Sequence, residues 1–448
     1  MRNRIRKQTR LVEPSIDHEH AKELKQIREI VSRCPEIADL VYDDLVRGLD
    51  DPETGRDGDM TAEQVFKVLL IKQMNGFSYR QLEYHLADSR TYRWFCDFGI
   101  GDKIPSESTL NRDIKKVRPE TLETINRSFL RIANKEGLEK GRKVRVDCTV
   151  TESNIHHPTD SSLLWDSVRV LCRLTERANE EFGMKVPDHR LRAKKRAMGI
   201  LNAKNDKIRK KHYRDLLKVT KKVVSDAEGV LASLAAIGAS NITALSICTE
   251  LSHYLPLIRR VLEQTKRRVI LGEKLKPEEK LVSIFEPHTD IIVKDRRDTY
   301  YGHKLAITGG ASGLLTDLFI EDGNPADATI AQRMIDRQKE IYGRVPRQAA
   351  FDGGFASKPN LASIKKQGVK DVAFSKKRGL KIDEMTKSTW VYKQLRNFRA
   401  GIEGMISFLK RSFGLTRCTW RGLASFKAYA WSSVVTANLL LMARRMLV

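Results

Sequence analysis

The stretch RKVRVDCTV, residues 142–150, is where the character of the chain changes. Apolar and polar residues alternate here, which is typical of a β-strand, whereas the preceding residues recur at helical spacing. Asp147 lies inside this run of β-forming residues, where aspartate is depleted. Such an acid usually has a partner, either a cation or a metal ion. The competing interpretation is an edge-strand acid paired with Arg145 or Lys304.

Upstream of this strand, residues 1–140 are predicted to be entirely helical. Residues 61–74 are apolar nearly all round, which indicates a buried helix, and residues 78–81 have the pattern of a capping box. A further short helix is expected over 106–117, with Arg112 near its first turn. Short helices that display cations early resemble a helix-turn-helix, although many helical bundles share the pattern. We therefore predict a helix-turn-helix-like DNA-binding domain over residues 1–140.

Downstream of this strand, the order of elements predicts an α/β fold. Helical signals fill residues from about 160 to 280 and form an insertion. The elements expected after it are two hairpin strands (300–308 and 314–321), a helix to about 342, a strand (348–352), a helix (358–366), a strand (369–375), a polar loop (376–388) and helix to the end. Without the insertion, this order predicts a mixed sheet flanked by helices within a domain spanning residues 141–448.

The charge of the chain is strongly positive. Lys and Arg number 82 against 57 Asp and Glu, a formal net charge of +25 over 448 residues. Such an excess favours a polyanionic partner, and nucleic acid is the usual one. Residues 190–222 look like a helix with a basic face, interrupted by only two acids, Asp206 and Asp215. That face either contacts phosphates, or the segment is a solvated helical hairpin.

Several classes of protein are disfavoured by what the sequence lacks. Its 6 Cys are scattered without a CxxC pair, which argues against a zinc ribbon or a disulfide framework and favours the cytoplasm. The apolar run over 428–448 is broken by polar and cationic residues, so we predict a buried helix there and no membrane partner. There is no P-loop, GxSxG or HExxH motif.

A second candidate acid, Asp352, ends the strand expected over 348–352. Gly353 and Gly354 follow it directly, and glycine permits both close backbone approach and positive φ. The alternative is that Asp352 is only a turn-forming residue at a strand end.

The third candidate acid lies in the stretch NFRAGIEGMISFLK, residues 397–410. Arg399, Glu403 and Lys410 are spaced i, i+4, i+11 and so share one helix face. An apolar stripe runs beside them, formed by Leu395, Phe398, Ile402, Met405, Leu409 and Phe413. A carboxylate between two cations suits a metal ion held beside a phosphodiester. The alternative is a solvated charged face.

Three carboxylates without His or Cys suit oxygen-preferring ions such as Mg²⁺ or Mn²⁺. Two such ions about 4 Å apart can activate an attacking oxygen and stabilise a leaving oxygen in phosphoryl transfer. The composition leaves rival acids open: Glu152, Asp160, Asp166, Asp317, Glu321, Asp322 and Asp327.

Taken in order, five short motifs resemble the DDE transposases of bacterial insertion sequences, most closely the ISNCY-like group. They are VDCT around Asp147, YYGHK at 300–304, GNPAD at 323–327, AFDGGF at 350–355 and R-x3-E-x6-K from Arg399 to Lys410. The resemblance covers nearly the whole chain. It implies an RNase H-like catalytic core with a large helical insertion between the first and second core strands.

The resemblance also implies roles for individual residues. It places the catalytic, metal-binding triad on Asp147, Asp352 and Glu403, with two Mg²⁺ or Mn²⁺ ions. Arg399 and Lys410 match the signature that surrounds the glutamate and would contact DNA phosphates. Relatives have tyrosine where this chain has Arg396, a departure. We predict Arg396 and Arg112 as further DNA-binding residues.

The activity implied is that of a DNA transposase. It would bind the terminal inverted repeats of its element as a homodimer on double-stranded DNA, cleave at the ends, and join the 3′-OH to target DNA. The location implied is the bacterial cytoplasm, in association with the nucleoid. Two alternatives remain: a metal-dependent, structure-specific DNA nuclease with the same core, and a non-catalytic DNA-binding protein.

Overall fold

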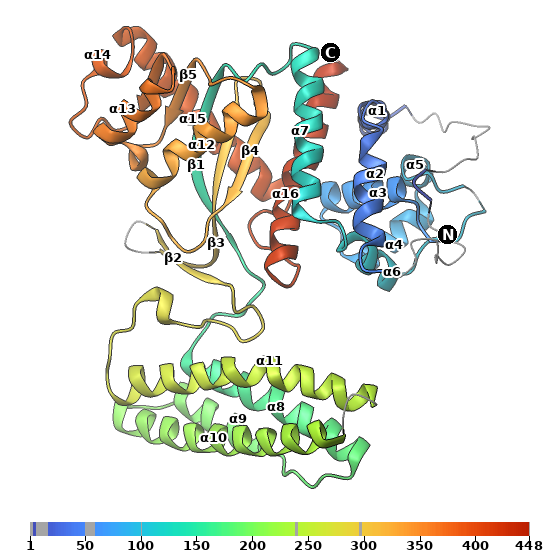
Figure 1. Ribbon diagram of the computed structural model, residues 1–448, viewed down its shortest axis with the longest axis vertical. Helices are drawn as coiled ribbons and strands as arrows, with labels where there is room; N and C mark the ends of the chain where they lie inside the picture. The colour runs from blue at the N-terminus through green and yellow to red at the C-terminus, as the bar shows by residue number, and fades with distance from the viewer. Residues whose placement is uncertain are drawn as a thin grey trace. The chain divides into compact units, whose positions relative to one another are not determined.

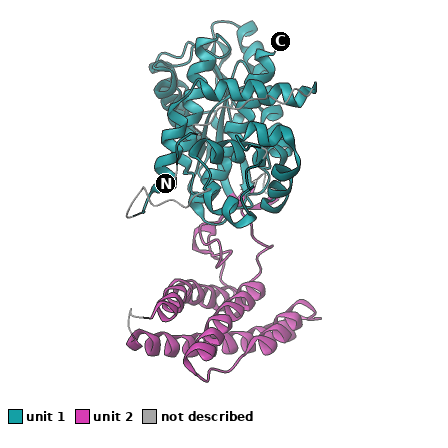
Figure 2. Ribbon diagram, turned by 90° about the vertical axis from the view of Figure 1, so that its right-hand side faces the viewer, with its two compact units in different colours: residues 1–152, 303–448 teal, residues 153–302 magenta. Residues whose placement is uncertain are grey.

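The computed structural model describes residues 3–5, 17–49, 59–99, 101–237, 241–294 and 298–447. The chain divides into two compact units (Figure 2). Unit 1 consists of residues 1–152 and 303–448, and unit 2 consists of residues 153–302. The boundary expected near residue 140 lies within unit 1, and it stays a prediction.

The first part of unit 1 is helical, as predicted. Its helices are α1 (Glu19–Ser32), α2 (Glu36–Val46), α3 (Ala62–Asn75), α4 (Tyr79–Asp88), α5 (Arg90–Phe95), α6 (Glu107–Ile114) and α7 (Pro119–Lys135). The predicted capping box is confirmed, because Ser78 and Gln81 bond reciprocally at the start of α4. Gly76 ends α3 in the left-handed conformation, a role that glycine fills without steric cost.

Helix α16 (Leu423–Met446) is the buried C-terminal helix that the sequence predicts. It packs against α1, α3 and α7 and is buried along most of its length. Its buried Asn438 donates to Asn126 on α7 and to the Leu315 carbonyl, both at 2.8 Å, so this amide is satisfied internally. In the described part of the chain, no helix combines the length and apolarity that crossing a membrane requires.

The sheet of unit 1 contains β1 (Lys143–Glu152), β3 (Asp298–Gly310), β4 (Leu315–Ile320), β5 (Gln348–Phe351) and β6 (Asp371–Phe374). The spatial order is β4-β3-β1-β5-β6. Strands β1, β5 and β6 are parallel, whereas β3 and β4 form the antiparallel hairpin that was predicted. This mixed sheet flanked by helices confirms the α/β class and the RNase H-like architecture (Figure 1).

Successive side chains of β1 point to opposite faces of the sheet. Val144 and Val146 belong to the same core as α12 (Asp327–Tyr342) and α13 (Lys358–Lys366). Arg145 and Asp147 point the other way and contact α15 (Thr389–Ser412). Because β1 lies between β3 and β5, the interpretation of Asp147 as an edge-strand acid is wrong.

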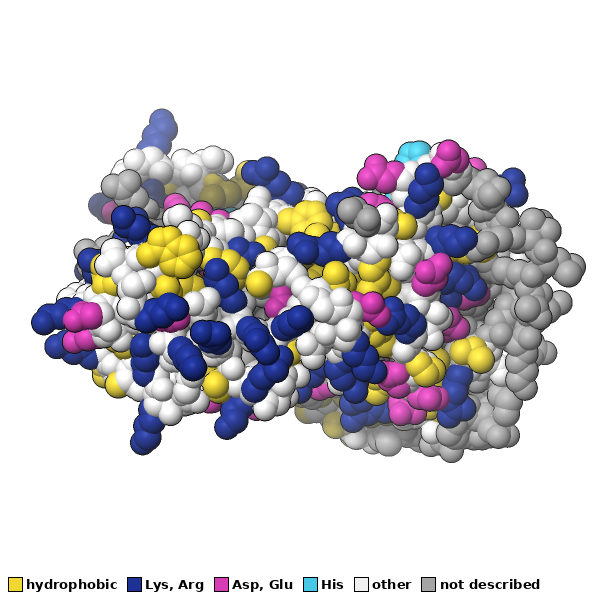
Figure 3. Space-filling view, turned by 90° about the horizontal axis from the view of Figure 1, so that it is seen from above, with side chains coloured by type: hydrophobic (Ala, Val, Ile, Leu, Met, Phe, Trp, Pro, Cys, Tyr) yellow, Lys and Arg dark blue, Asp and Glu magenta, His cyan; other side chains and the backbone are white. Residues whose placement is uncertain are grey.

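Between β6 and α15 the structure differs from the prediction in one detail. The segment expected to be a polar loop contains a short helix, α14 (Ile382–Met385). At the start of this helix the Lys381 backbone N–H donates to Glu384 Oε2 at 2.9 Å, which is half of a capping box and a weak local signal. Lys and Arg side chains cover much of the face seen in Figure 3, consistent with the net charge.

Unit 2 is a helical bundle with its own apolar core. It contains α8 (Asp160–Phe182), α9 (Arg190–Leu201), α10 (Asp206–Ile237) and α11 (Ile242–Thr265), followed by β2 (Asp290–Lys294), which pairs antiparallel with the start of β3. The insertion between the first two core strands is therefore helical, as predicted. Its basic segment forms two helices, α9 and α10, as the alternative of a helical hairpin predicts and not a single helix.

Candidate active site

Two of the candidate acids occupy neighbouring positions across the sheet. The parallel register pairs Val146 of β1 with Phe351 of β5, so the next residues, Asp147 and Asp352, fall side by side. Phe351 is paired with Phe374 of β6, which places Ser375 beside Asp352. The Ser375 hydroxyl donates to Asp352 Oδ1 at 2.7 Å. The sheet thus fixes both acids in one row, with Asp147 midway along β1 and Asp352 directly after the end of β5.

Arg399 of α15 joins these two acids to the third. Its Nη2 atom lies 2.8 Å from Asp147 Oδ2 and 3.3 Å from Asp352 Oδ1. Its Nη1 atom lies 2.7 Å from Glu403 Oε1, one helical turn away. All three predicted acids therefore contact one guanidinium group. The side chains become more exposed in the order Asp147, Asp352 and Glu403, at 15%, 38% and 66%.

Helix α15 lies across the parallel strands because its apolar stripe is buried there. Leu395, Ile402 and Leu409 are at most 1% exposed, as the sequence spacing predicts. Arg145 of β1 supports the helix from below by donating to the Phe398 carbonyl at 2.9 Å and stacking on the Phe398 ring. A Cβ atom at Gly401 would collide with this guanidinium, so glycine allows the helix to approach β1 closely.

The two glycines after Asp352 also allow the backbone to lie close to neighbouring side chains. Neither Gly353 nor Gly354 has a positive φ, so of the two properties that glycine permits, only close backbone approach is used at these positions. A Cβ atom on Gly353 would lie 2.6 Å from the Cβ of Lys376, and one on Gly354 would collide with the carboxylate of Asp327. The glycines therefore let the chain after Asp352 pack under two neighbouring segments.

The surroundings of Asp352 favour its ionised form. Burial by itself would raise the pKa of this carboxyl. Hydrogen bonds from Ser375 and from the backbone of Gly353 and Gly354, together with the charge of Arg399, outweigh burial and hold the pKa below its usual value. Asp352 is therefore a carboxylate at neutral pH, as a metal ligand needs to be.

A second polar group lies on the opposite layer of the sheet. Lys304 of β3 contacts Asp327 Oδ1 at 2.5 Å and donates to the Pro325 carbonyl at 2.6 Å. Cys148 hydrogen-bonds Asp327 as well, and burial, followed by the Asp327 charge, raises the pKa of its thiol well above the usual value. Cys148 is therefore a protonated thiol and not a nucleophile. Sequence reasoning missed this group, although the YYGHK and GNPAD motifs contain three of its members, Lys304, Pro325 and Asp327.

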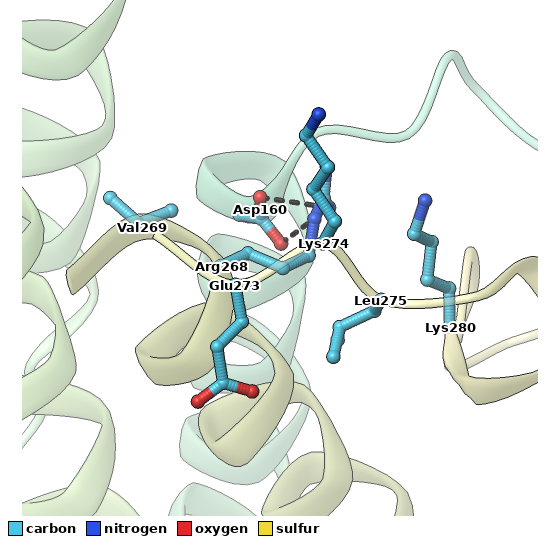
Figure 4. A pocket seen from close by; sticks show the side chains of 7 residues that line it. All are labelled: Asp160, Arg268, Val269, Glu273, Lys274, Leu275 and Lys280. Carbon is cyan, nitrogen blue, oxygen red and sulfur yellow. Dashed lines mark hydrogen bonds and ion pairs between the residues drawn. The ribbon is translucent and has the colours of Figure 1, made fainter. Parts of the chain in front are cut away.

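The rival acids mostly have structural partners. Asp317 and Glu321 are at most 3% exposed and bind Arg337 and Arg333 of α12. In unit 2, Asp166 contacts Arg169 at 2.8 Å. Asp160 contacts Arg268 at the wall of a cavity of about 450 Å³ (Figure 4). Asp322 is exposed, and Glu152 forms a backbone bridge with Arg417.

The pair of Asp317 and Arg337 yields a stability prediction. Burial raises the pKa of Asp317, and Arg337 offsets only part of that rise. Replacing Arg337 by leucine would leave a buried charge, so we expect Arg337→Leu to cost about 3 kcal/mol at pH 7. Because folding raises the pKa of Asp317, its carboxyl takes up a proton in the folded protein above the unfolded pKa of about 3.9. Lowering the pH toward that value therefore removes the buried charge, and the stability lost in Arg337→Leu should become smaller.

Urea unfolding at several pH values measures this effect. The matched control is Arg127→Leu, because Arg127 is half-exposed and its partner Glu123 remains accessible to water. That change should cost at most about 1 kcal/mol. A loss in Arg337→Leu that stays constant from neutral to acidic pH would refute the buried-charge explanation.

The three acids provide the donor set that a hard divalent cation prefers, namely carboxylate oxygens without sulfur or imidazole. Within the described ranges, however, no group of three His, Cys, Asp or Glu side chains is arranged to hold a metal ion. The guanidinium of Arg399 lies among the three carboxylates. The donor chemistry fits a divalent metal ion, and all three acids could share such an ion only if Arg399 moved.

The predicted DNA-binding cations lie on two parts of unit 1. Arg396 is exposed on α15, one turn before Arg399, and Lys410 is partly exposed on the same helix. Arg112 lies on α6, is half-exposed and contacts Asp113 at 2.9 Å. Sequence reasoning missed the run Lys376, Lys377 and Arg378, which is exposed immediately after Ser375. Its position after a predicted strand end was the available signal.

Two ranges of the chain match known protein families. Residues 13–116 match a transposase domain of the DUF772 family, and residues 288–439 match the transposase DDE domain. The chain belongs to the DDE transposases of insertion sequences. No curated protein and no solved structure matches it. The assignment to the ISNCY-like group stays a prediction.

The two matches divide this transposase unevenly. The first covers the helices up to α6, and the second includes Asp352, Glu403 and the two strands of the hairpin. Asp147 and the helices of unit 2 lie between the matched ranges. The convergence of Asp147 with the other two acids is therefore a feature of the structure and not of the family matches.

Proposed function

We propose that this transposase binds the terminal inverted repeats of its insertion sequence, cleaves at the ends and joins the resulting 3′-OH to target DNA. The observation that supports this most is the contact of one guanidinium with three carboxylates from β1, the end of β5 and α15. An acidic site of this kind, on a strongly basic chain, suits phosphoryl transfer on DNA.

In this proposal the catalytic and metal-binding residues are Asp147, Asp352 and Glu403. Two Mg²⁺ or Mn²⁺ ions, when bound, would lower the pKa of the attacking hydroxyl or water and neutralise charge on the leaving oxygen. The sheet holds Asp147 and Asp352 in fixed register, so their carboxylates are positioned before DNA binds. Glu403 is more exposed and can reorient on its helix.

The cations around the acids would hold the DNA. Arg399 would exchange its carboxylate partners for a phosphate of the element end, and Lys410 and Arg396 would contact phosphates along the same helix. We assign Arg112 to DNA contact by the N-terminal helices. Pairing of two ends by a homodimer is part of the proposal, as is action on bacterial DNA in the cytoplasm, at the nucleoid.

A strand-transfer assay tests this function. The purified protein is incubated with Mg²⁺, a supercoiled target plasmid and a labelled duplex carrying the element end with a precut 3′-OH. The expected result is covalent joining of that end to the plasmid. Cleavage of an uncut end without any joining would favour the nuclease, and metal-independent binding with neither reaction would favour the non-catalytic binder.

A further inference from the structure

The long helix α10 of unit 2 carries an unneutralised row of cations. Lys207, Lys211, Arg214, Lys218 and Lys221 follow one another at steps of four, three, four and three residues, with Lys210 beside them. At 3.6 residues per turn, these positions fall within an arc of about 100° and extend over about 21 Å of helix. We call these six residues the α10 stripe.

The α10 stripe faces solvent because the opposite side of the helix forms the bundle core. Tyr213, Leu216 and Val223 are at most 7% exposed and pack within the apolar core of unit 2. All six cations of the stripe are exposed. The bundle therefore fixes the stripe on a rigid helix without using its charges for folding.

Several arginines of unit 2 are neutralised by acids, whereas the cations of the stripe are not. Arg177 and Arg173 contact Glu250, and Arg259 contacts Glu228. No residue of the stripe forms an ion pair with any acid in the part of the chain that the structure describes.

Like charges one turn apart on a helix repel, by roughly 0.2–0.5 kcal/mol for each pair. The row is therefore mildly unfavourable in the free protein. A polyanion would relieve the repulsion.

We propose that the α10 stripe binds the sugar–phosphate backbone of double-stranded DNA without reading its sequence. The length of the stripe matches about six phosphates of one strand, which are spaced roughly 3.4 Å apart along the duplex axis. The ammonium group of lysine lacks the planar pair of N–H donors with which arginine recognises base edges. Contact with phosphates is therefore the expected mode of binding. This inference rests on the proposed function for its partner, but it concerns binding and not chemistry.

The test is DNA binding by the full chain at several salt concentrations. The stripe variant combines Lys211→Gln, Arg214→Gln and Lys218→Gln. The control variant combines Lys185→Gln, Lys266→Gln and Lys274→Gln, three exposed cations of unit 2 outside α10. Both variants lose the same charge. Fluorescence anisotropy follows a labelled random-sequence duplex of roughly 40 base pairs, in EDTA to prevent cleavage, between about 50 and 200 mM salt.

We expect the stripe variant to lose about two to three units of the slope of log K against log salt, and tenfold to a hundredfold in affinity at about 0.15 M salt. The control variant should keep the wild-type slope, and melting curves should show both variants folded. Equal slopes in the stripe variant and wild type would overturn the proposal. It would also fail if the stripe variant lost binding only to phosphatidylserine vesicles.

The outcome is separable from that of the proposed function. Strand transfer by the wild type tests the carboxylates and the chemistry, whereas the slope in EDTA tests only the stripe. A wild type that binds DNA through the stripe but joins no ends would leave the stripe proposal standing and refute the transposition chemistry.

Discussion

Asp147→Asn and Asp352→Asn should each reduce end cleavage and strand transfer by at least about a thousandfold, equivalent to about 4 kcal/mol of transition-state stabilisation. Asparagine keeps the size of each side chain but removes the negative charge that a divalent cation needs. Because both residues lie at fixed positions on neighbouring parallel strands, no other carboxylate can take their place without breaking the register. Glu403→Gln should have a similar effect on both reactions.

Gel-based cleavage assays on labelled element ends measure the loss, and gel shifts in Ca²⁺ or EDTA measure binding. End binding should stay within a few-fold of wild type, because the acids contribute no attraction for DNA. The matched control is Asp322→Asn, an exposed acid of the same unit that should cut at the normal rate. Normal cutting by any of the three site variants would remove that residue from the proposed triad.

The sequence predicts the helices and strands that carry this site, but it does not predict how they come into contact. The alternation over 142–150, the glycines after Asp352 and the apolar stripe of 397–410 each report local structure, and each predicted element exists. The sequence cannot predict that Arg399 contacts Asp147, because the two are 252 residues apart and meet only through the packing of α15 on β1. That contact depends on Gly401 and Arg145, whose roles have no local signature.

The sequence also cannot tell which of the rival acids are buried structural residues. Asp317 is as plausible as Asp352 in sequence, since both end or interrupt strand-like runs beside small or apolar residues. What separates them is the partner: Arg337 of α12 covers Asp317, which is 1% exposed, whereas Asp352 stays accessible beside Asp147. Burial is a property of the folded layers, and hydrophobic pattern alone does not assign one acid to the core and another to a reactive edge.

Arg399→Gln should separate two roles of this arginine by its effect on metal affinity. In the free protein the guanidinium contacts all three acids and offsets one of their three negative charges, so a metal ion shared by the acids would have to displace it. Glutamine would leave the carboxylates without that cation, and the apparent affinity for Mg²⁺ in the absence of DNA should rise at least about tenfold. The same change should lower strand transfer by about a hundredfold or more, because a phosphate contact is lost.

Isothermal titration calorimetry with Mg²⁺ gives the affinity, and melting temperature with and without Mg²⁺ gives an independent readout. Without metal, the Arg399→Gln protein should melt below wild type because its three acids repel each other; saturating Mg²⁺ should close most of that gap. The control is Arg396→Gln, one turn earlier on α15, where the exposed arginine has no carboxylate partner in the described ranges. Its Mg²⁺ affinity should equal that of wild type. If Arg399→Gln also bound Mg²⁺ no better than wild type, the guanidinium would not be what keeps the metal out.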